Sequence, residues 1–353
     1  MQQITLIRKT LQPHLGWHGA RVTFLALFLM ALFRVKTVNF AELATGFMGT
    51  AHLDSNYKRL QRFFKTFEID YHRLARLVAH LMDIPQPWVL SIDRTNWQFG
   101  DSVFNILTLG VVHRGVAFPL LWLMLDKKGN SNSGERIDLL NEFLEVFPEV
   151  EVAYITADRE FLGHKWFQYL LEQAHLEFRI RIRHSDKLGD GRQSLSAKVV
   201  FSALQIRQHQ VLRHPRQVWG HWVYVAALRL EDGSLLIVVT NHRPHQAMTD
   251  YSQRWGIETL FGCLKTRGFC LESTHLQDAE RLSRMIALLT IALCWAFRTG
   301  EWLEQERSIP IKSHGRKAKS IFRYGFDYLR RTFLNLELFA DEFLEVLKLL
   351  SCT

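Results

Sequence analysis

Cysteine is scarce in this chain, with four in 353 residues, at positions 263, 270, 294 and 352. Such sparse usage is typical of a reducing cytoplasm rather than of an oxidising compartment. Cys263 and Cys270 are separated by six residues, which is not the ligand spacing of a zinc site. We therefore expect a cytoplasmic protein without a zinc motif.

Long hydrophobic runs are missing as well. The apolar runs 23–33 and 285–297 are shorter than the roughly 20 residues that a helix needs to span a bilayer. We interpret both as buried helices. No signal peptide, internal repeat or low-complexity tract is recognisable. These absences argue against a membrane as a partner of this protein.

The residue patterns of covalent and zinc-dependent hydrolases are also absent. No Ser-His-Asp or Cys-His arrangement stands out, so the sequence indicates no protein nucleophile. None of the sixteen histidines falls in an HExxH spacing. We interpret most of them as structural or surface residues.

The charge balance is basic. Lys and Arg number 44 against 35 Asp and Glu, which gives a net charge of +9. This excess favours an anionic partner, and nucleic acid is the first candidate. The hydrophobic content of 48% is that of an ordinary globular protein.

One segment carries polar residues in a helical pattern. Tyr251, Arg254, Glu258 and Lys265 fall at offsets 0, 3, 7 and 14, within an arc of about 60° on one helix. Apolar residues fill the adjoining arc, so that side is expected to dock. This edge offers a carboxylate for a divalent metal and three ligands for phosphate. The simpler alternative is an exposed Arg254–Glu258 ion pair on a surface helix.

Two aspartates follow short apolar runs. Asp93 closes the run 88–93 and Asp158 closes the run 152–158, and both runs are typical of buried strands. A carboxylate at the end of a buried strand is costly unless it is paired or binds a metal. In open parallel sheets, ligands lie at the carboxyl ends of strands. Each Asp could instead be a helix N-cap or a turn residue.

These motifs together resemble a known family. They match the DDE transposases of the bacterial insertion-element family 4, whose signature is Y-(2)-R-(3)-E-(6)-K. The resemblance spans nearly the whole chain and rests on the segments 55–64, 91–97, 156–161, 251–276 and 314–323.

The resemblance implies roles for named residues. Asp93, Asp158 and Glu258 would form a catalytic triad that binds two Mg²⁺ ions, with Mn²⁺ able to substitute. The residues that would hold DNA phosphates are Tyr251, Arg254 and Lys265. The implied reaction is cut-and-paste transposition: nicking at the element ends, excision and strand transfer.

The resemblance also implies partners. They are double-stranded DNA, as terminal inverted repeats and as target, and a second copy of the chain in a homodimer on DNA. The place of action would be the bacterial cytoplasm, at the nucleoid. Some relatives stack a Trp on an extruded base from the strand before the signature helix. Here that strand, 235–240, has no Trp; Trp219 and Trp222 could substitute or be core or surface aromatics.

A basic helix face is expected near the start of the chain. The segment 54–66, with Asp54 or Ser55 as its N-cap, places Lys58, Arg62 and Lys65 opposite an apolar stripe. We interpret these cations as DNA contacts, the alternative being a solvated charged face. The segment 312–331 has seven Lys and Arg and one acidic residue, and we expect it to contact the DNA backbone too.

The expected fold is α/β: a ribonuclease H-like core with a β-rich insertion, flanked by helical regions. We expect a helical DNA-binding domain (1–85), a first part of the core (86–183), the insertion (184–245), a helix carrying Glu258 (246–275) and a helical C-terminal region (276–353). The expected helices are 17–33, 38–48, 54–66, 70–82, 134–147 and 161–174. The expected strands are 88–93, 103–112, 116–125, 152–157, 177–183, 210–213, 221–230 and 235–240, with a turn at Asp232-Gly233.

Overall fold

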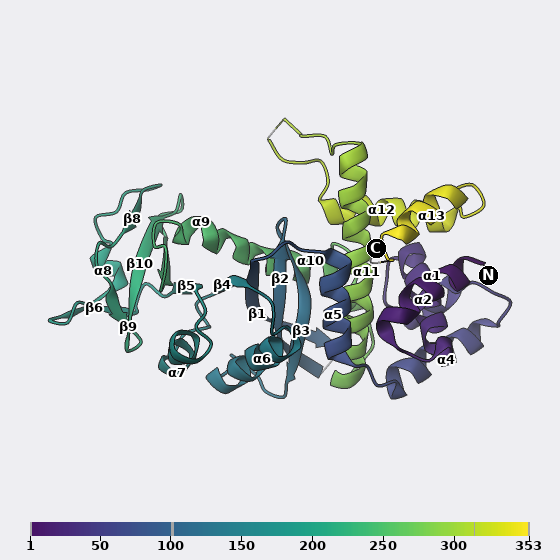
Figure 1. Cartoon of the computed structure of the whole chain (residues 1–353), viewed down its shortest axis with the longest axis horizontal. Coiled ribbons are helices and arrows are strands. Elements are labelled where there is room, and N and C mark those ends of the chain that lie inside the picture. The colour runs from purple at the N-terminus through teal and green to yellow at the C-terminus, as the bar shows by residue number, and fades with distance from the viewer. Residues whose placement is uncertain (1, 100–101, 314, 352–353) are drawn as a thin grey trace. The chain divides into compact units, whose positions relative to one another are not determined.

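The computed structural model describes residues 2–99, 102–313 and 315–351 (Figure 1). It divides into two compact units. The helical unit comprises Met1–Ile84, Trp97–Phe104 and Leu260–Thr353, and the sheet unit comprises Pro85–Asn96 and Asn105–Thr259. His314 of the basic C-terminal segment and Cys352 lie outside the described residues.

The helical unit combines helices from both ends of the chain. They are α1 (Gln2–Leu15), α2 (Gly19–Val35), α3 (Phe40–Gly46), α4 (Leu53–Thr66), α5 (Tyr71–Met82), α11 (Ala279–Glu306), α12 (Ile321–Leu334) and α13 (Ala340–Lys348). The four expected helices before residue 85 form with ends that differ by at most two residues. Helix α1 was not expected, although its buried residues Ile4, Ile7, Leu11 and Leu15 recur at helical spacing.

Helix α11 is the centre of this unit. It packs against α12 and α5, and a Cβ on Gly325 of α12 would lie 1.9 Å from the carbonyl oxygen of Ala296. By length and composition α11 could cross a membrane, and so could α2 and α3 if that bent pair were one span. However, 89% of the apolar window of α11 is buried inside the protein. This burial explains the apolar composition of α11 as that of a core helix.

The sheet unit is built on the strand order β3-β2-β1-β4-β5. The strands are β1 (Trp88–Phe99), β2 (Ser102–His113), β3 (Val116–Leu125), β4 (Val152–Ala157) and β5 (Phe178–Ile182). β1, β4 and β5 are parallel, whereas β2 and β3 form an antiparallel hairpin. This is the expected ribonuclease H-like α/β fold.

Strand β1 is longer than the sequence predicts, so the expectation that Asp93 closes the strand is wrong. Pairing of β1 with β4 stops at Ile92 opposite Ala157. β1 continues to Phe99 because it also neighbours β2 on its other side. Asp93 is therefore the first residue of β1 beyond its pairing with β4.

Two helical segments follow the third and fourth strands. Helix α6 (Ser133–Val146) begins with a capping box between Asn132 and Glu135. The second expected helix, 161–174, is not continuous, because it divides into α7 (His164–Gln168) and a π-helical turn at Tyr169–Gln173.

The insertion extends the core sheet instead of forming a sheet of its own. Its elements are β6 (Lys187–Gly189), β7 (Ser194–Ser196), α8 (Ala197–Val200), β8 (His209–Val211), β9 (Arg216–Val218), β10 (His221–Arg229) and β11 (Leu235–Thr240). β11 pairs antiparallel with β5, so the sheet continues into the insertion. The expected turn joins β10 to β11, where Gly233 has a φ of +80° and Asp232 accepts a hydrogen bond from the backbone N–H of Ser234.

Candidate active site

The register of two parallel strands places Asp93 and Asp158 at neighbouring positions. The last pair between β1 and β4 is Ile92 and Ala157, and each Asp is the next residue of its chain segment. Both side chains are partly covered, with 14% of Asp93 and 30% of Asp158 exposed. Asp158 accepts a 3.4 Å hydrogen bond from the Tyr251 hydroxyl and lies 3.8 Å from an Arg181 nitrogen.

The segment with Tyr251, Arg254 and Glu258 is not one continuous α-helix, contrary to expectation. It consists of α9 (Ala247–Tyr251), a 3₁₀ turn (Ser252–Arg254) and α10 (Trp255–Leu264). The ψ angles of −26° at Tyr251 and Ser252 and −19° at Trp255 are those of a tighter but still helical backbone. Close approach to the sheet is possible because residue 256 is Gly, where a Cβ would lie 3.0 Å from Val112.

Arg254 joins two of the carboxylates. Its guanidinium lies 3.4 Å from Asp93 Oδ2 and donates to Glu258 Oε1. The Arg254 side chain is only 5% exposed, which rules out the alternative of an ion pair on a surface helix. The same guanidinium lies over the rings of Tyr251 and Trp255, at 5.8 and 5.3 Å. One buried cation thus links strand β1 to helix α10.

Burial is the largest influence on the pKa of Asp93. It raises the pKa of Asp93 to about 7, and the charges of Glu160 and Asp158 act in the same direction. The backbone N–H of Arg94, at 2.8 Å from Asp93 Oδ1, and the Arg254 guanidinium lower the pKa without outweighing the burial. Asp93 is therefore only partly ionised at neutral pH, because its burial outweighs the stabilisation by Arg94 and Arg254.

The donor set suits a hard divalent cation. Asp93, Asp158 and Glu258 supply carboxylate oxygens, which Mg²⁺ prefers. Within the described residues, no group of three His, Cys, Asp or Glu is arranged to hold a metal ion. In the arrangement seen here, Arg254 bonds to Asp93 and Glu258. The residue types fit such a cation by chemistry, and a bound ion would have to share these oxygens with the Arg254 guanidinium.

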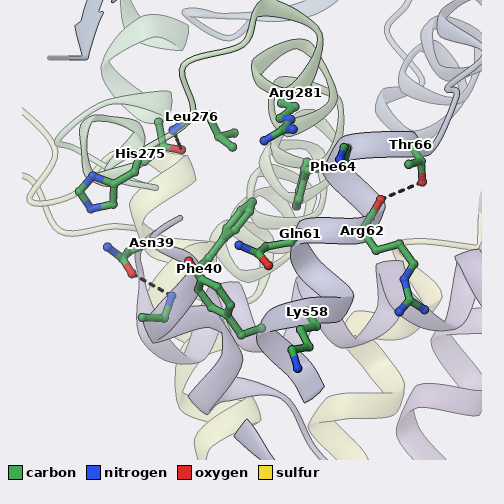
Figure 2. A pocket seen from close by; sticks show the side chains of 14 residues that line it. Asn39, Phe40, Lys58, Gln61, Arg62, Phe64, Thr66, His275, Leu276 and Arg281 are labelled. Carbon is green, nitrogen blue, oxygen red and sulfur yellow. Dashed lines mark hydrogen bonds between the residues drawn. The ribbon is translucent and has the colours of Figure 1, made fainter. Parts of the chain in front are cut away.

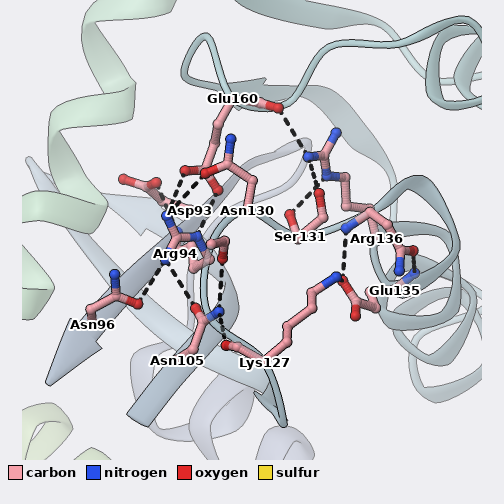
Figure 3. Close-up of polar contacts among 12 residues, drawn as sticks. Asp93, Arg94, Asn96, Asn105, Lys127, Asn130, Ser131, Glu135, Arg136 and Glu160 are labelled. Carbon is pink, nitrogen blue, oxygen red and sulfur yellow. Dashed lines mark hydrogen bonds and ion pairs between the residues drawn. The ribbon is translucent and has the colours of Figure 1, made fainter. Parts of the chain in front are cut away.

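A polar network surrounds Asp93 (Figure 3). Arg94 donates to both carboxylate oxygens of Glu160, at 3.1 and 3.2 Å. The same guanidinium donates to the side-chain oxygens of Asn96, Asn105 and Asn130. The Arg94 side chain next to Asp93 is thus held by five hydrogen bonds to other side chains.

The loop after β3 joins this network. The side-chain amide of Asn105 donates to the carbonyls of Lys127 and Gly129, each at 2.9 Å. Arg136 donates to Ser131 Oγ at 2.8 Å and to the Glu160 carbonyl at 2.9 Å. The loop and the segment after β4 are therefore fixed to each other next to the two aspartates.

Sequence reasoning gave no role to Arg94, Glu160, Asn105 or Arg136. A signal existed for the first two, because Arg94 is one residue after Asp93 and Glu160 is two residues after Asp158. Opposite charges just beyond the last pair of two parallel strands can form an ion pair. Asn105 and Arg136 had no comparable pattern, since most of their partners are backbone carbonyls of separate segments.

The sheet unit by itself brings together five of the expected residues: Asp93, Asp158, Tyr251, Arg254 and Glu258. Lys265 follows α10 and belongs to the helical unit. Its ammonium lies 4.9 Å from the ring centre of Trp97, and burial lowers its pKa.

The basic face of α4 forms as expected. Lys58, Arg62 and Lys65 are exposed, while Leu60 and Phe63 are fully buried. The expected N-cap is wrong: α4 begins after His52, without a side-chain cap, so Asp54 lies in the first turn.

Trp219 and Trp222 of the insertion are surface residues, with exposures of 42% and 55%. This placement rules out a core role for either ring.

Comparisons with known proteins decide the family. A family model described as transposase DDE domain matches residues 85–295, more than half of the chain. The chain belongs to this family. It is a DDE transposase, an enzyme that cleaves and transfers DNA.

The structural comparisons are distant. A piggyBac transposase in a synaptic complex with hairpin DNA is 11% identical, with a TM-score of 0.48, and covers 96% of this chain and 79% of that chain. The catalytic domain of human Endonuclease V is 18% identical, with a TM-score of 0.32, and covers 60% and 94% respectively. No curated protein matches significantly. The family assignment therefore rests on the family model.

Proposed function

We propose that this transposase is of the insertion-element family 4 type and catalyses cut-and-paste transposition with divalent metal ions. The observation that supports this best is the joining of three carboxylates from separate segments. Asp93 and Asp158 follow the last pair of two parallel strands, and Arg254 connects Asp93 to Glu258. Outside a site for cations, such a concentration of half-buried carboxylates would be destabilising.

Asp93, Asp158 and Glu258 would hold two Mg²⁺ ions, with Mn²⁺ as a substitute. When bound, these ions would help to deprotonate the attacking water or 3′-hydroxyl and stabilise the leaving oxygen. The protein residues do the positioning. Tyr251 donates to Asp158 and stays a phenol at any physiological pH, because burial raises its pKa. The Arg94 guanidinium pairs with Glu160, and the Arg94 backbone N–H donates to Asp93 Oδ1, which orients that carboxylate.

Arg254 has two functions in this proposal. It neutralises Asp93 and Glu258 in the arrangement seen here. With Asp93 and Glu258 engaged by metal, its planar guanidinium would be available to a phosphate next to the cut. Lys265 would be a second phosphate ligand, as a point charge.

The partners follow from this reaction. The substrates would be terminal inverted repeats and target DNA, bound by a homodimer in the bacterial cytoplasm at the nucleoid. The net charge of +9 and the exposed cations Lys58, Arg62 and Lys65 support a DNA partner.

The decisive experiment is a time course on a labelled element end with an unlabelled target duplex. With Mg²⁺ or Mn²⁺ we expect nicked, excised and joined products in succession. With Ca²⁺ we expect end binding without cleavage, because Ca²⁺ prefers more ligands at longer distances. Cleavage without any joined product would instead identify a nuclease of the same fold, and full activity in a chelator would refute the metal mechanism.

A further inference from the structure

The helical unit contains a pocket of about 710 Å³ that the catalytic site does not use (Figure 2). Its walls come from the start of α3, one face of α4, the segment 274–276 and the first turn of α11. Its volume is within the range of small-molecule sites. In Figure 2, Lys58, Arg62, Arg281 and His275 lie around the ring of Phe40 and the amide of Gln61.

Hydrogen bonds hold these walls together. The Arg284 guanidinium of α11 donates to the carbonyl of Phe64 in α4 at 3.1 Å. The hydroxyls of Thr37, before α3, and Ser273, before the segment 274–276, share another hydrogen bond. The pocket is therefore preformed by parts of the chain more than 200 positions apart.

The pocket is cationic and lacks compensating acids. Lys58, Arg62, Lys65 and Arg281 line it, and none of its described lining residues is acidic. In the described part of the chain, these four side chains form no ion pair. Four cations that converge without a carboxylate favour an anionic ligand.

Aromatic rings distinguish this pocket from a simple phosphate surface. The rings of Phe40 and Tyr57 meet edge to face at 6.4 Å between centroids, and Tyr57 is 37% exposed. Phe40 also stacks on the buried Phe64 at 5.1 Å, which fixes its orientation. The Gln61 amide beside them can both donate and accept hydrogen bonds.

We propose that this pocket binds one unpaired nucleotide of a DNA strand, with its phosphate on the α4 cations and its base against Tyr57 and Phe40. The inference rests on the proposed action on DNA and adds a second binding site to it. Cations that follow the backbone and aromatic rings that stack on bases are the combination used by single-strand binding sites. A paired base exposes only its edges, so it cannot place a face on Tyr57.

The test measures binding by fluorescence anisotropy with the full chain in a chelator, so that no cleavage occurs. The probes are an oligothymidine of about 12 nucleotides, an abasic chain with equal phosphates and a matching duplex. We expect wild type to bind oligothymidine about tenfold more tightly than the abasic chain. Tyr57→Leu should abolish this preference, and Tyr57→Phe, which keeps the ring, should retain it.

Charge variants separate the phosphate contribution. Replacing Lys58, Arg62 and Lys65 with Ala should weaken binding of all three probes. A matched triple variant of exposed cations elsewhere in the unit, at Lys9, Arg76 and Arg307, should have a smaller effect. Thermal melting of each variant checks that it folds. We expect the Tyr57 variants to fold, because this side chain is exposed.

Three results would overturn the proposal: equal wild-type affinity for the three probes, no selective effect of Tyr57→Leu, or equally good competition by polyglutamate of matched charge. Each would leave strand joining at Asp93, Asp158 and Glu258 unaffected. Conversely, an absence of strand joining would refute the proposed function without changing this binding result.

Discussion

Within the described parts of the chain, charged side chains are paired in the carboxylate site of the sheet unit but unpaired in the basic pocket of the helical unit. Around Asp93 the charges are balanced within the protein, by Arg254 and by the Arg94–Glu160 pair. No acidic residue lines the pocket, and Lys58 and Arg62 form no ion pair with the described residues. A buried charge is costly unless it is paired, whereas an exposed charge is hydrated and stays available to bind a ligand. In the first site the charges fix the positions of the carboxylates, and in the second they are available to a polyanion.

The basic C-terminal segment lies between these extremes. Of its seven cations, Lys317 pairs with Glu304, and Lys319 and Arg323 both pair with Asp327. Those three are partly neutralised by the protein itself. The segment's expected DNA contact stays a prediction, and its paired cations should contribute less than the α4 face.

Substitution of the three carboxylates should have the largest effect on activity. Asp93→Ala, Asp158→Ala or Glu258→Ala should each lower cleavage by about 10³-fold or more, because each removes ligands worth several kcal/mol in the transition state. End binding should be largely retained. The measurement is the nicking rate on a labelled element end, with the exposed Asp138→Ala as control. Near wild-type cleavage by any of the three would exclude that residue from the triad.

Substitution of the two cations Arg254 and Lys265 should have the next largest effect. Arg254→Ala and Lys265→Ala should slow strand joining more than nicking, on the order of 10²-fold, because small misplacement of the strands is costly. Arg254→Lys should recover part of the loss, since it restores charge without the bidentate fork. Wild-type kinetics for nicking and joining in both Ala variants would reduce this segment to a scaffold for Glu258.

The charge balance at Asp93 also predicts a dependence of stability on pH. Its pKa rises from an ordinary 3.8 to about 7 on folding, so the folded state holds this proton more tightly than the unfolded state. The stabilisation is complete below about pH 4 and is lost as the pH rises to about 7. Asp93→Asn should therefore be more stable than wild type at pH 8, by a few kcal/mol at most.

Thermal melting at pH 4 and pH 8 measures this difference. Mg²⁺ should raise the wild-type melting temperature at pH 8 and should raise that of Asp93→Asn less. A constant difference between the two proteins from pH 4 to pH 8 would show that Asp93 titrates normally.

The smallest effect sharpens the comparison of the basic surfaces. Replacing Lys58, Arg62 and Lys65 with Ala should make the slope of log K against log salt shallower by about 0.9 per lost phosphate contact. The same number of replacements at Lys317, Lys319 and Arg323 should change the slope less, because those cations already have acidic partners. Titration of duplex binding with salt gives both slopes, and identical changes would remove the distinction.

Much of this protein could be predicted from its amino-acid sequence. Local patterns predicted the core strands, most helices, the basic face of α4 and the carboxylates and cations of the candidate site. Such features depend on periodicity and spacing along the chain, which sequence displays directly. The motifs around Asp93, Asp158 and Glu258 were enough to indicate a DDE transposase.

Features that depend on contacts between distant segments became visible only in the folded chain. The register of β1 and β4 makes Asp93 and Asp158 neighbours, and burial turns Arg254 from a surface ion pair into a bridge. The pairing of β11 with β5 joins the insertion to the core. The pocket beside α4 needs residues from 274–281, far away in sequence. Pairing, burial and the resulting shift at Asp93 arise from packing in three dimensions, and no spacing along the chain specifies them.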